Sequence, residues 1–204
     1  MIRVLAVDDH PLLRDGISVL IGNQTDMELV AEASTGREAL EQFRKHCPDV
    51  TLMDLQMPDM SGIDAIGGIR GEFPEARIIV LTTHAGDVQI SRAFKAGARA
   101  YLLKGLLRKE LLETIRVVHA GGKRVSSEVA AEIAEHATDD ALTPREVDVL
   151  CLVARGNANK AVAAQLLLTE ETIKSHMRNI LAKLGANDRT HAVAIAVKRG
   201  IIDV

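Results

Sequence analysis

The stretch TLMDLQMP, residues 51–58, decides how the front of this chain folds. The apolar run DVTLM has the length of a buried strand and stops at Asp54. Polar residues follow, and Pro58 is poorly suited to extending a central strand. A carboxylate at the end of a buried strand is costly unless its charge has partners. The position of Asp54 therefore indicates a site rather than a simple strand end.

The same unit, a short apolar run followed by a helical pattern, occurs five times in the first 120 residues. The apolar runs lie at residues 3–9, 27–33, 49–54, 77–83 and 98–103, and the helical patterns at 11–22, 36–46, 62–73, 87–97 and 108–121. Strands that alternate with helices predict a parallel sheet covered on both faces. We therefore expect an α/β fold with a five-stranded doubly wound sheet.

The rest of the chain has a helical pattern throughout. Residues 121–140 look like a linker with a short helix from Ser126 to about His136. Four helices are then predicted at 144–155, 159–166, 170–183 and 190–199. Thr143 and Glu146 have the spacing of a capping box at the start of the first. The expected domains are 1–120, the linker 121–140, and an all-α domain 141–204.

Composition limits the classes of function. Only 2% of the residues are aromatic and none is Trp, which argues against a base-stacking platform for single strands. Residues 142–204 hold nine Lys or Arg against six Asp or Glu, whereas the front is acidic, so the halves should have different partners. Cys47 and Cys151 are far apart and read as reduced thiols of a cytoplasmic protein. No apolar run is long enough for a membrane span, and we expect no membrane partner.

Carboxylates follow two strands that the expected sheet brings together. Asp8 and Asp9 end the first run and Asp54 ends the third, while Thr82 and Lys104 end the fourth and fifth. Ligands of doubly wound sheets bind at the carboxyl ends of the strands. Clustered carboxylates repel one another unless a cation joins them, and oxygen ligands of this kind suit Mg²⁺. A carboxylate there can also accept a phosphoryl group, with Lys104 and Thr82 stabilising it.

Four motifs at these positions resemble a bacterial response-regulator receiver domain: DDHP (8–11), MDLQMPDMSG (53–62), LTTH (81–84) and YLLKG (101–105). The resemblance implies a flavodoxin-like sheet in the order 2-1-3-4-5 with Asp54 as the phosphoacceptor. It implies a Mg²⁺ held by Asp8, Asp9, Asp54 and the backbone carbonyl of Gln56. The residues expected to contact the phosphoryl group or to switch with it are Thr82, Thr83, Lys104 and Tyr101.

Some residues around this motif set admit two interpretations. Gln56 and His84 would tune hydrolysis of the phosphoryl group, or they are surface variation. Tyr101 is a switch aromatic or an ordinary strand aromatic, and His10 is a turn or cap residue or a functional one. The isomer of the bond before Gly105 stays open, because many receivers have proline there.

Two of the predicted helices, 159–166 and 170–183, are separated by a short turn, which is the spacing of a helix-turn-helix. Thr169 can cap the second. Its apolar stripe is Ile173, Met177, Ile180, Leu181 and Leu184, and its opposite face carries Glu171, Lys174, Ser175, Arg178 and Asn179. That face is either a solvated surface or a surface that reads the major groove.

The pieces TPRE (143–146), NK (159–160), TIKSHMRNILAKLG (172–185) and RTHAVAIA (189–196) resemble the LuxR-type helix-turn-helix of NarL/FixJ response regulators. The resemblance implies base contacts by Lys174, Ser175 and Arg178. It implies contacts to the DNA backbone by Asn159, Lys160, Thr172, His176 and Lys183. The segment from Thr190 to Val197 would be a dimer face.

Together the two resemblances imply a two-component response regulator. A sensor histidine kinase would phosphorylate Asp54 and thereby control homodimerisation and binding to double-stranded promoter DNA. One alternative is a Mg²⁺-dependent phosphohydrolase, but Gln56 stands where such an enzyme needs a second carboxylate. Another is a regulator that binds DNA constitutively. We expect no enzymatic activity beyond slow autodephosphorylation of Asp54.

Overall fold

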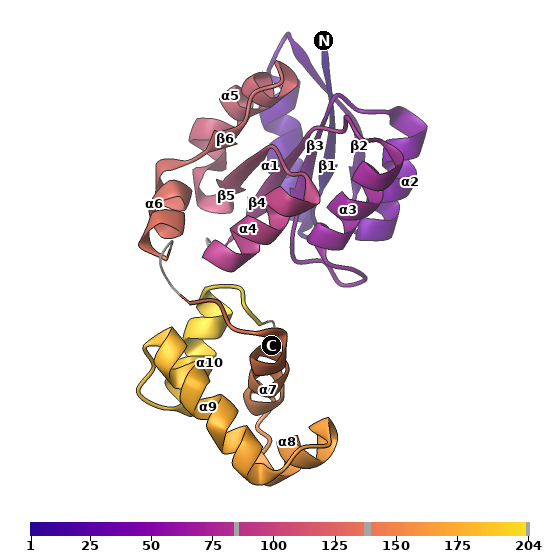
Figure 1. Ribbon diagram of the computed structural model, residues 1–204. Coiled ribbons are helices and arrows are strands. Elements are labelled where there is room, and N and C mark those ends of the chain that lie inside the picture. The colour runs from indigo at the N-terminus through magenta and orange to yellow at the C-terminus, as the bar shows by residue number, and fades with distance from the viewer. Residues whose placement is uncertain (84–85, 137–139, 203–204) are drawn as a thin grey trace. The chain divides into compact units, whose positions relative to one another are not determined.

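A computed structural model describes residues 1–83, 86–136 and 140–202, and these form two compact units (Figure 1). The first comprises Met1–His84 and Ile90–Ala130, and the second comprises Ala85–Gln89 and Ala131–Val204.

The first unit is built on a parallel sheet in the order β2-β1-β3-β4-β5-β6. The strands are β1 (Ile2–Val7), β2 (Met27–Ala33), β3 (Val50–Asp54), β4 (Ile78–Thr82), β5 (Ala100–Leu103) and β6 (Arg124–Val125). Every residue of β3 and β4 is buried, as expected for central strands covered on both faces. The five predicted strands and their order are confirmed.

The sixth strand corrects the expectation of a five-stranded sheet. Arg124 and Val125 extend the edge beside β5 within the segment that we assigned to the linker. The Arg124 backbone N–H donates to the Arg99 carbonyl at 3.1 Å, and its guanidinium pairs with Glu113 at 2.9 Å. The strand has only two residues and Val125 is exposed, so it leaves no alternating apolar pattern in the sequence from which to predict it.

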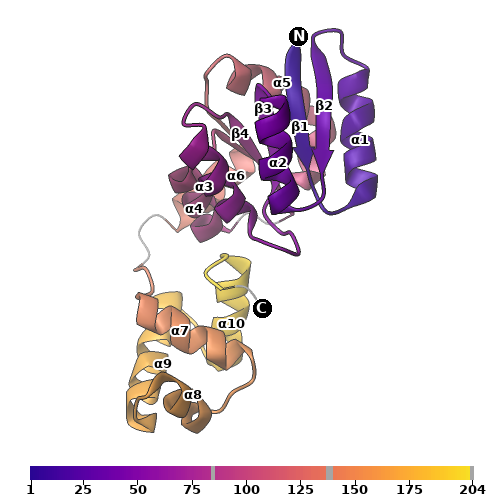
Figure 2. The same cartoon turned by 90° about the vertical axis from the view of Figure 1, so that its right-hand side faces the viewer.

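Five helices cover the sheet, and one short 3-10 turn precedes the last. They are α1 (Pro11–Gly22), α2 (Gly36–His46), α3 (Gly62–Glu72), α4 (Asp87–Ala96), η1 (Lys104–Leu106) and α5 (Leu107–His119). The apolar sides of α1 and α5 share one core with the sheet, and α2 and α3 pack against each other (Figure 2). The bond between Lys104 and Gly105 is trans.

Strand register brings the carboxyl ends of β1, β3 and β4 to one edge. Val7 lies opposite Met53, and Asp54 lies opposite Leu81. The residue after Val7 is therefore level with Asp54. The predicted convergence of strand-end side chains follows directly from this alignment.

The second unit is helical, and the boundary between the units falls within α6 (Ser127–Glu135), whose residues from Ala131 onward belong to it. The four predicted helices follow as α7 (Pro144–Ala154), α8 (Asn159–Leu166), α9 (Glu170–Leu184) and α10 (Arg189–Lys198). The capping box is confirmed: Glu146 N–H donates to the Thr143 hydroxyl at 3.3 Å, and Thr143 N–H donates to the Glu146 carboxylate at 2.8 Å. No helix among the described residues is both long and apolar enough to cross a membrane.

The turn between α8 and α9 contains an unusual residue. Leu167 closes α8 in the left-handed conformation, with φ +56°, and it is 92% exposed. Left-handed backbone costs a residue with a Cβ roughly 1–2 kcal/mol, and glycine is the usual solution at this position. The exposed side chain gains little burial in return, so Leu167 holds local strain.

We predict that Leu167→Gly raises the free energy of unfolding of the full chain's helical unit by roughly 0.5–1 kcal/mol. The matched control is Leu167→Ala, which removes the exposed apolar side chain but keeps the Cβ and its strain. Chemical denaturation followed by circular dichroism measures both variants. If glycine and alanine stabilise the chain equally, the effect comes from removing the exposed leucine side chain, and the idea of backbone strain at Leu167 is wrong.

Candidate functional site

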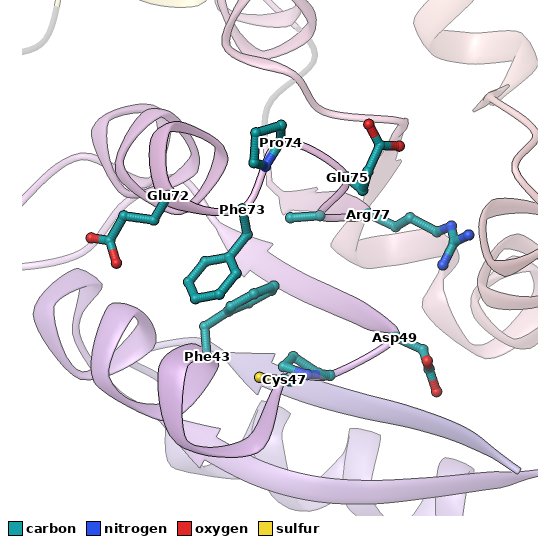
Figure 3. A pocket seen from close by; sticks show the side chains of 10 residues that line it. Phe43, Cys47, Asp49, Glu72, Phe73, Pro74, Glu75 and Arg77 are labelled. Carbon is teal, nitrogen blue, oxygen red and sulfur yellow. The ribbon is translucent and has the colours of Figure 1, made fainter.

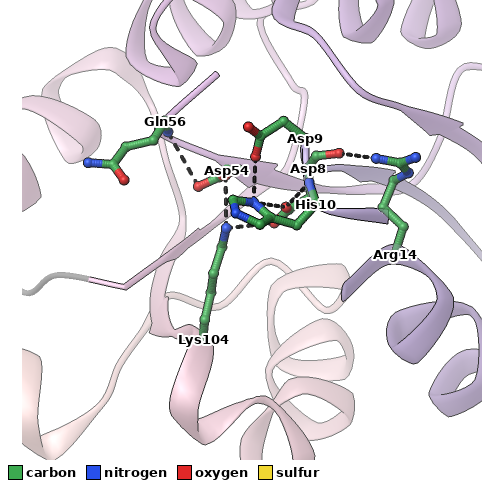
Figure 4. Close-up of polar contacts among 7 residues, drawn as sticks. All are labelled: Asp8, Asp9, His10, Arg14, Asp54, Gln56 and Lys104. Atoms are coloured by element: carbon green, nitrogen blue, oxygen red, sulfur yellow. Dashed lines mark hydrogen bonds and ion pairs between the residues drawn. The ribbon is translucent and has the colours of Figure 1, made fainter. Parts of the chain in front are cut away.

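The carboxyl edge of the sheet gathers two buried carboxylates around one ammonium (Figure 4). Asp8 follows β1 and is 0% exposed, and Asp54 ends β3 and is 2% exposed. Lys104 follows β5, and its Nζ lies 2.8 Å from Asp8 Oδ2 and 2.8 Å from Asp54 Oδ2. Asp9, half-buried, stands beside them. The edge therefore brings together the four charged residues that the sequence predicted for it.

This cluster has more negative charge than its surroundings stabilise. Burial raises the pKa of Asp54 above its ordinary value, and the hydrogen bond and charge of Lys104 only partly oppose this. Burial acts against the charge of Lys104, yet its contacts with Asp54 and Asp8 raise the pKa of the ammonium overall. The pair is thus a carboxylate whose charged form is disfavoured by burial, beside a lysine whose charged form is favoured by its two acidic partners.

Backbone contacts fix the two acidic strand ends. The His10 N–H donates to Asp8 Oδ1 at 2.9 Å, and the Arg14 guanidinium donates to the Asp8 carbonyl. The Gln56 N–H donates to Asp54 Oδ1 at 3.3 Å. The carboxylates are therefore held by turns of their own loops, which limits the loss of order when a ligand binds.

The loop after Asp54 is attached at two further points. A Cβ on Gly62 would lie 2.0 Å from the Asp54 carbonyl oxygen, so only glycine permits this approach. At the loop's centre, Asp59 accepts the N–H groups of Gly36 (2.9 Å) and Arg37 (3.0 Å) at the start of α2. The Arg37 N–H is the main cause that holds the pKa of Asp59 below its usual value. The carbonyl of Gln56 therefore belongs to a loop with little freedom.

The donor set of the cluster suits a hard cation. Asp8, Asp9, His10 and Asp54 each offer a ligand atom, and these atoms lie within 4.8 Å of one another. Asp8 Oδ2 and Asp9 Oδ1 are buried, and each lies close to one nitrogen, Lys104 Nζ at 2.8 Å and His10 Nδ1 at 2.6 Å. Clustered carboxylate oxygens that share so few donors favour a metal ion. The sequence named the three carboxylates, while His10 stood there only as an open alternative.

Thr82 and Tyr101 form a buried pair next to the cluster. Thr82 ends β4 and Tyr101 lies in β5, and both are almost wholly buried. Their side chains are hydrogen-bonded, and burial raises the pKa of the phenol far above its usual value. The adjacent Thr83 is exposed and helps to line a cavity of about 360 Å³ whose wall includes Lys104. His84 lies outside the described residues.

A second cavity, of about 350 Å³, opens near the amino ends of β3 and β4 (Figure 3). Its floor is the ring pair of Phe43 and Phe73, with centroids 4.9 Å apart. Two of its carboxylates already have partners: Glu72 pairs with Arg44, and Asp49 accepts the Arg3 N–H at 2.8 Å. This cavity contains none of the predicted site residues.

In the second unit, one face of α9 is exposed. Lys174, Ser175 and Arg178 all lie on it, opposite a buried stripe of Ile173, Met177, Ile180 and Leu184. The Lys174 ammonium lies 3.5 Å from the carboxylate of Glu171 on the same helix, an exposed pair that holds it weakly. The Thr169 hydroxyl accepts the Thr172 N–H, so the predicted cap of α9 is confirmed. Leu181 is only partly buried.

The five residues expected at a DNA backbone differ in their surroundings. Lys160 is exposed, and Asn159 and His176 are half-buried. The Thr172 hydroxyl lies 2.8 Å from that of Thr169. Lys183 donates to the Glu146 carboxylate at 2.8 Å and to the Ala141 carbonyl at 3.2 Å. Lys160, by contrast, is exposed and has no such contact with any residue that the structure describes.

Comparison with known proteins adds sequence relationships to this geometry. Residues 4–116 match the response regulator receiver domain family, and residues 140–196 match the bacterial regulatory proteins of the luxR family. The chain is 40% identical over 205 residues to the transcriptional regulatory protein YhcZ of Bacillus subtilis, covering 96% of this chain and 95% of that protein. It is 38% identical to the Bacillus subtilis transcriptional regulatory protein LiaR over the full length of both chains.

A solved structure extends the likeness to three dimensions. RcsB of Salmonella enterica serovar Typhimurium, bound to promoter P1flhDC in the presence of phosphomimetic BeF3−, superposes with a TM-score of 0.76. The two chains are 25% identical, over 97% of this chain and 98% of that one. Together with the acidic edge and the exposed face of α9, these matches show that the chain belongs to the transcriptional response regulators that join a receiver domain to a luxR-family helix-turn-helix domain.

Proposed function

We propose that a sensor histidine kinase phosphorylates Asp54, and that the phosphoryl group controls homodimerisation and sequence-specific binding to promoter DNA. The observation that carries this proposal is the buried Asp54 within 2.8 Å of Lys104, in the same chain as an exposed helix-turn-helix face. The receiver domain spans residues 1–120, the linker 121–140 and the DNA-binding domain 141–204. We place the protein in the cytoplasm, where its kinase donor and its DNA are found.

In the transfer, an Asp54 carboxylate oxygen forms a bond to phosphorus while the bond from phosphorus to the donor nitrogen breaks and that nitrogen takes up a proton. Lys104 neutralises charge on the phosphoryl oxygens, and Thr82 and Thr83 donate hydrogen bonds to them. Asp8, Asp9, Asp54 and the Gln56 carbonyl would hold Mg²⁺. When bound, that ion would supply positive charge beside two buried carboxylates that otherwise share one lysine.

The signal leaves the site through the hydrogen-bonded pair of Thr82 and Tyr101. A phosphoryl group on Asp54 competes for the Thr82 hydroxyl, and Tyr101, buried beneath the adjoining surface, responds to its loss. Such a pair is a two-state element whose equilibrium the phosphoryl group biases. Slow hydrolysis of the aspartyl phosphate returns the protein to its resting state.

We predict that Asp54→Asn abolishes covalent phosphoryl uptake from acetyl phosphate with Mg²⁺, because the amide is not a nucleophile of this kind. Intact-mass spectrometry of the full chain measures the modification. Asp64→Asn, which removes an exposed carboxylate in the first turn of α3, is the matched control and should be modified like the wild type. A modified Asp54→Asn chain would disprove the assignment of the phosphoacceptor.

Binding to DNA is supported by two sets of side chains on α8 and α9, one suited to base edges and one suited to phosphates. The exposed Arg178, Lys174 and Ser175 have the chemistry that reads base edges in a major groove. Lys160, Asn159, Thr172 and His176 are suited to phosphates, which supply affinity that depends on salt. We retain Lys183 in this set, with the condition that it must leave Glu146 to reach a phosphate.

We predict that Arg178→Ala lowers affinity for the selected operator about 10- to 100-fold and leaves nonspecific affinity nearly unchanged, as loss of a base contact should. Lys160→Ala should weaken both kinds of binding and reduce the salt slope by about one. Fluorescence anisotropy across a salt series measures this, with Lys45→Ala on α2 as the control. Equal losses on specific and random DNA in Arg178→Ala would contradict its role in base reading.

Homodimerisation is supported by an apolar surface on α1. Leu12 is 86% exposed and Val19, two turns later on the same side, is 64% exposed. Beside them Leu13, Leu20 and Leu107 line a groove of about 520 Å³ between α1 and α5. On α10, Thr190, Ala194 and Val197 are exposed at helical spacing and form a second candidate face. A second copy of the chain would cover the α1 surface, the α10 surface, or both.

We predict that Leu12→Glu weakens the dimer formed with beryllofluoride and Mg²⁺ at least about tenfold, because a charge would enter an apolar contact. Sedimentation velocity of the full chain measures the dimer. Lys45→Glu, an exposed change on α2, should leave it intact. Normal dimerisation of the Leu12→Glu chain would exclude the α1 surface.

A further inference from the structure

His10 points into the acidic cluster rather than away from it (Figure 4). Its Nδ1 atom lies 2.6 Å from Asp9 Oδ1 and 3.3 Å from Asp8 Oδ1. It is also the one nitrogen donor among the described groups that could share a metal ion with Asp8, Asp9 and Asp54. The mechanism proposed above uses the carboxylates but gives this imidazole no task.

The ordinary structural roles of a histidine at this position do not account for the ring. His10 is the N-cap residue of α1, but its side chain makes no capping hydrogen bond. The side chain is 69% exposed, so it does not fill the core. Its contacts among the described residues are with the two aspartates that precede it. The geometry therefore relates the imidazole to the cluster itself.

The spacing of the donor atoms fits a shared ion. Adjacent ligand atoms of an octahedral ion with bonds of about 2.1 Å are about 3 Å apart. The two distances from His10 Nδ1 to the neighbouring carboxylate oxygens lie on either side of this value. We propose that His10 is a nitrogen ligand of this metal site and makes it favour divalent transition ions over Mg²⁺.

The backbone around His10 limits how far the imidazole can move. Its N–H is bonded to Asp8 Oδ1 at 2.9 Å, Pro11 follows it at the start of α1, and Arg14 binds the Asp8 carbonyl. Nδ1 is the ring nitrogen nearer the backbone, so a fixed backbone positions it well. The exposed side of the ring leaves a path from solvent for an ion.

The chemistry of the donor atoms determines which ions bind more tightly when His10 is present. Mg²⁺ prefers oxygen and keeps waters in its shell, so it gains little from an imidazole. Ions such as Co²⁺ bind imidazole strongly, and a neutral nitrogen adds affinity without adding to the crowded negative charge. His10 thus sets the ratio of Co²⁺ to Mg²⁺ affinity, while the carboxylates set the affinity for both. The inference rests on the proposed function only in using the same metal site.

The test compares wild type with His10→Ala and with His46→Ala, which removes a histidine at the end of α2 as the matched control. Isothermal titration of the full chain with Co²⁺ and with Mg²⁺ gives both affinities, and titration of Co²⁺ in the presence of Mg²⁺ identifies ions at the shared site. We expect His10→Ala to lose roughly tenfold in displaceable Co²⁺ affinity with a Mg²⁺ affinity within about twofold of wild type. His46→Ala should change neither. Circular dichroism verifies folding of each variant.

Two results would overturn the role of His10: parallel changes in Co²⁺ and Mg²⁺ affinity in His10→Ala, or Co²⁺ binding that Mg²⁺ does not displace. A failure of the proposed phosphoacceptor site looks different. In that case Asp54→Asn would still take up a phosphoryl group from acetyl phosphate, whatever the Co²⁺ and Mg²⁺ affinities of His10→Ala. The two hypotheses are thus separated by their readouts, metal affinity for His10 and covalent phosphoryl uptake for Asp54.

Discussion

The contact of Lys104 with Asp8 and Asp54 is the interaction on which the receiver site depends. Two carboxylates buried at the ends of neighbouring strands are stable together only because an ammonium lies 2.8 Å from each. Strand register dictates that these residues meet, and burial prevents water from screening them. Burial raises the pKa of Asp54, and Lys104 opposes this only in part. A cation beside the two carboxylates would reduce their repulsion and offset the negative charge of a phosphoryl group.

Much of this site was predictable because it follows from local pattern and sheet geometry. The first and third apolar runs both end at an aspartate. This pattern alone puts the carboxylates at one edge of the sheet, without knowledge of any contact. The Thr143 and Thr169 caps were predictable for the same reason, since capping depends on residues three positions apart. Features that depend on only a few neighbouring residues could thus be predicted from the sequence.

Features that depend on contacts between residues far apart in the sequence could not be predicted from it. The β6 edge strand is too short for a period, and the pairing of Lys183 with Glu146 joins residues 37 positions apart. The sequence presented Lys183 as a basic residue on a DNA-binding helix, and nothing local distinguished a lysine already engaged in an ion pair. The contact of His10 with Asp9 joins adjacent residues, but it depends on a side-chain orientation that the sequence does not determine.

The position of Lys183 has a mechanical consequence. One ammonium near the end of α9 joins Glu146, which caps α7, to the carbonyl of Ala141, where the linker enters the helical unit. A displacement of the chain at Ala141 must therefore break this bond or carry the last turn of α9 with it. A single lysine thus ties the first residues of the helical unit to the helix that carries Arg178.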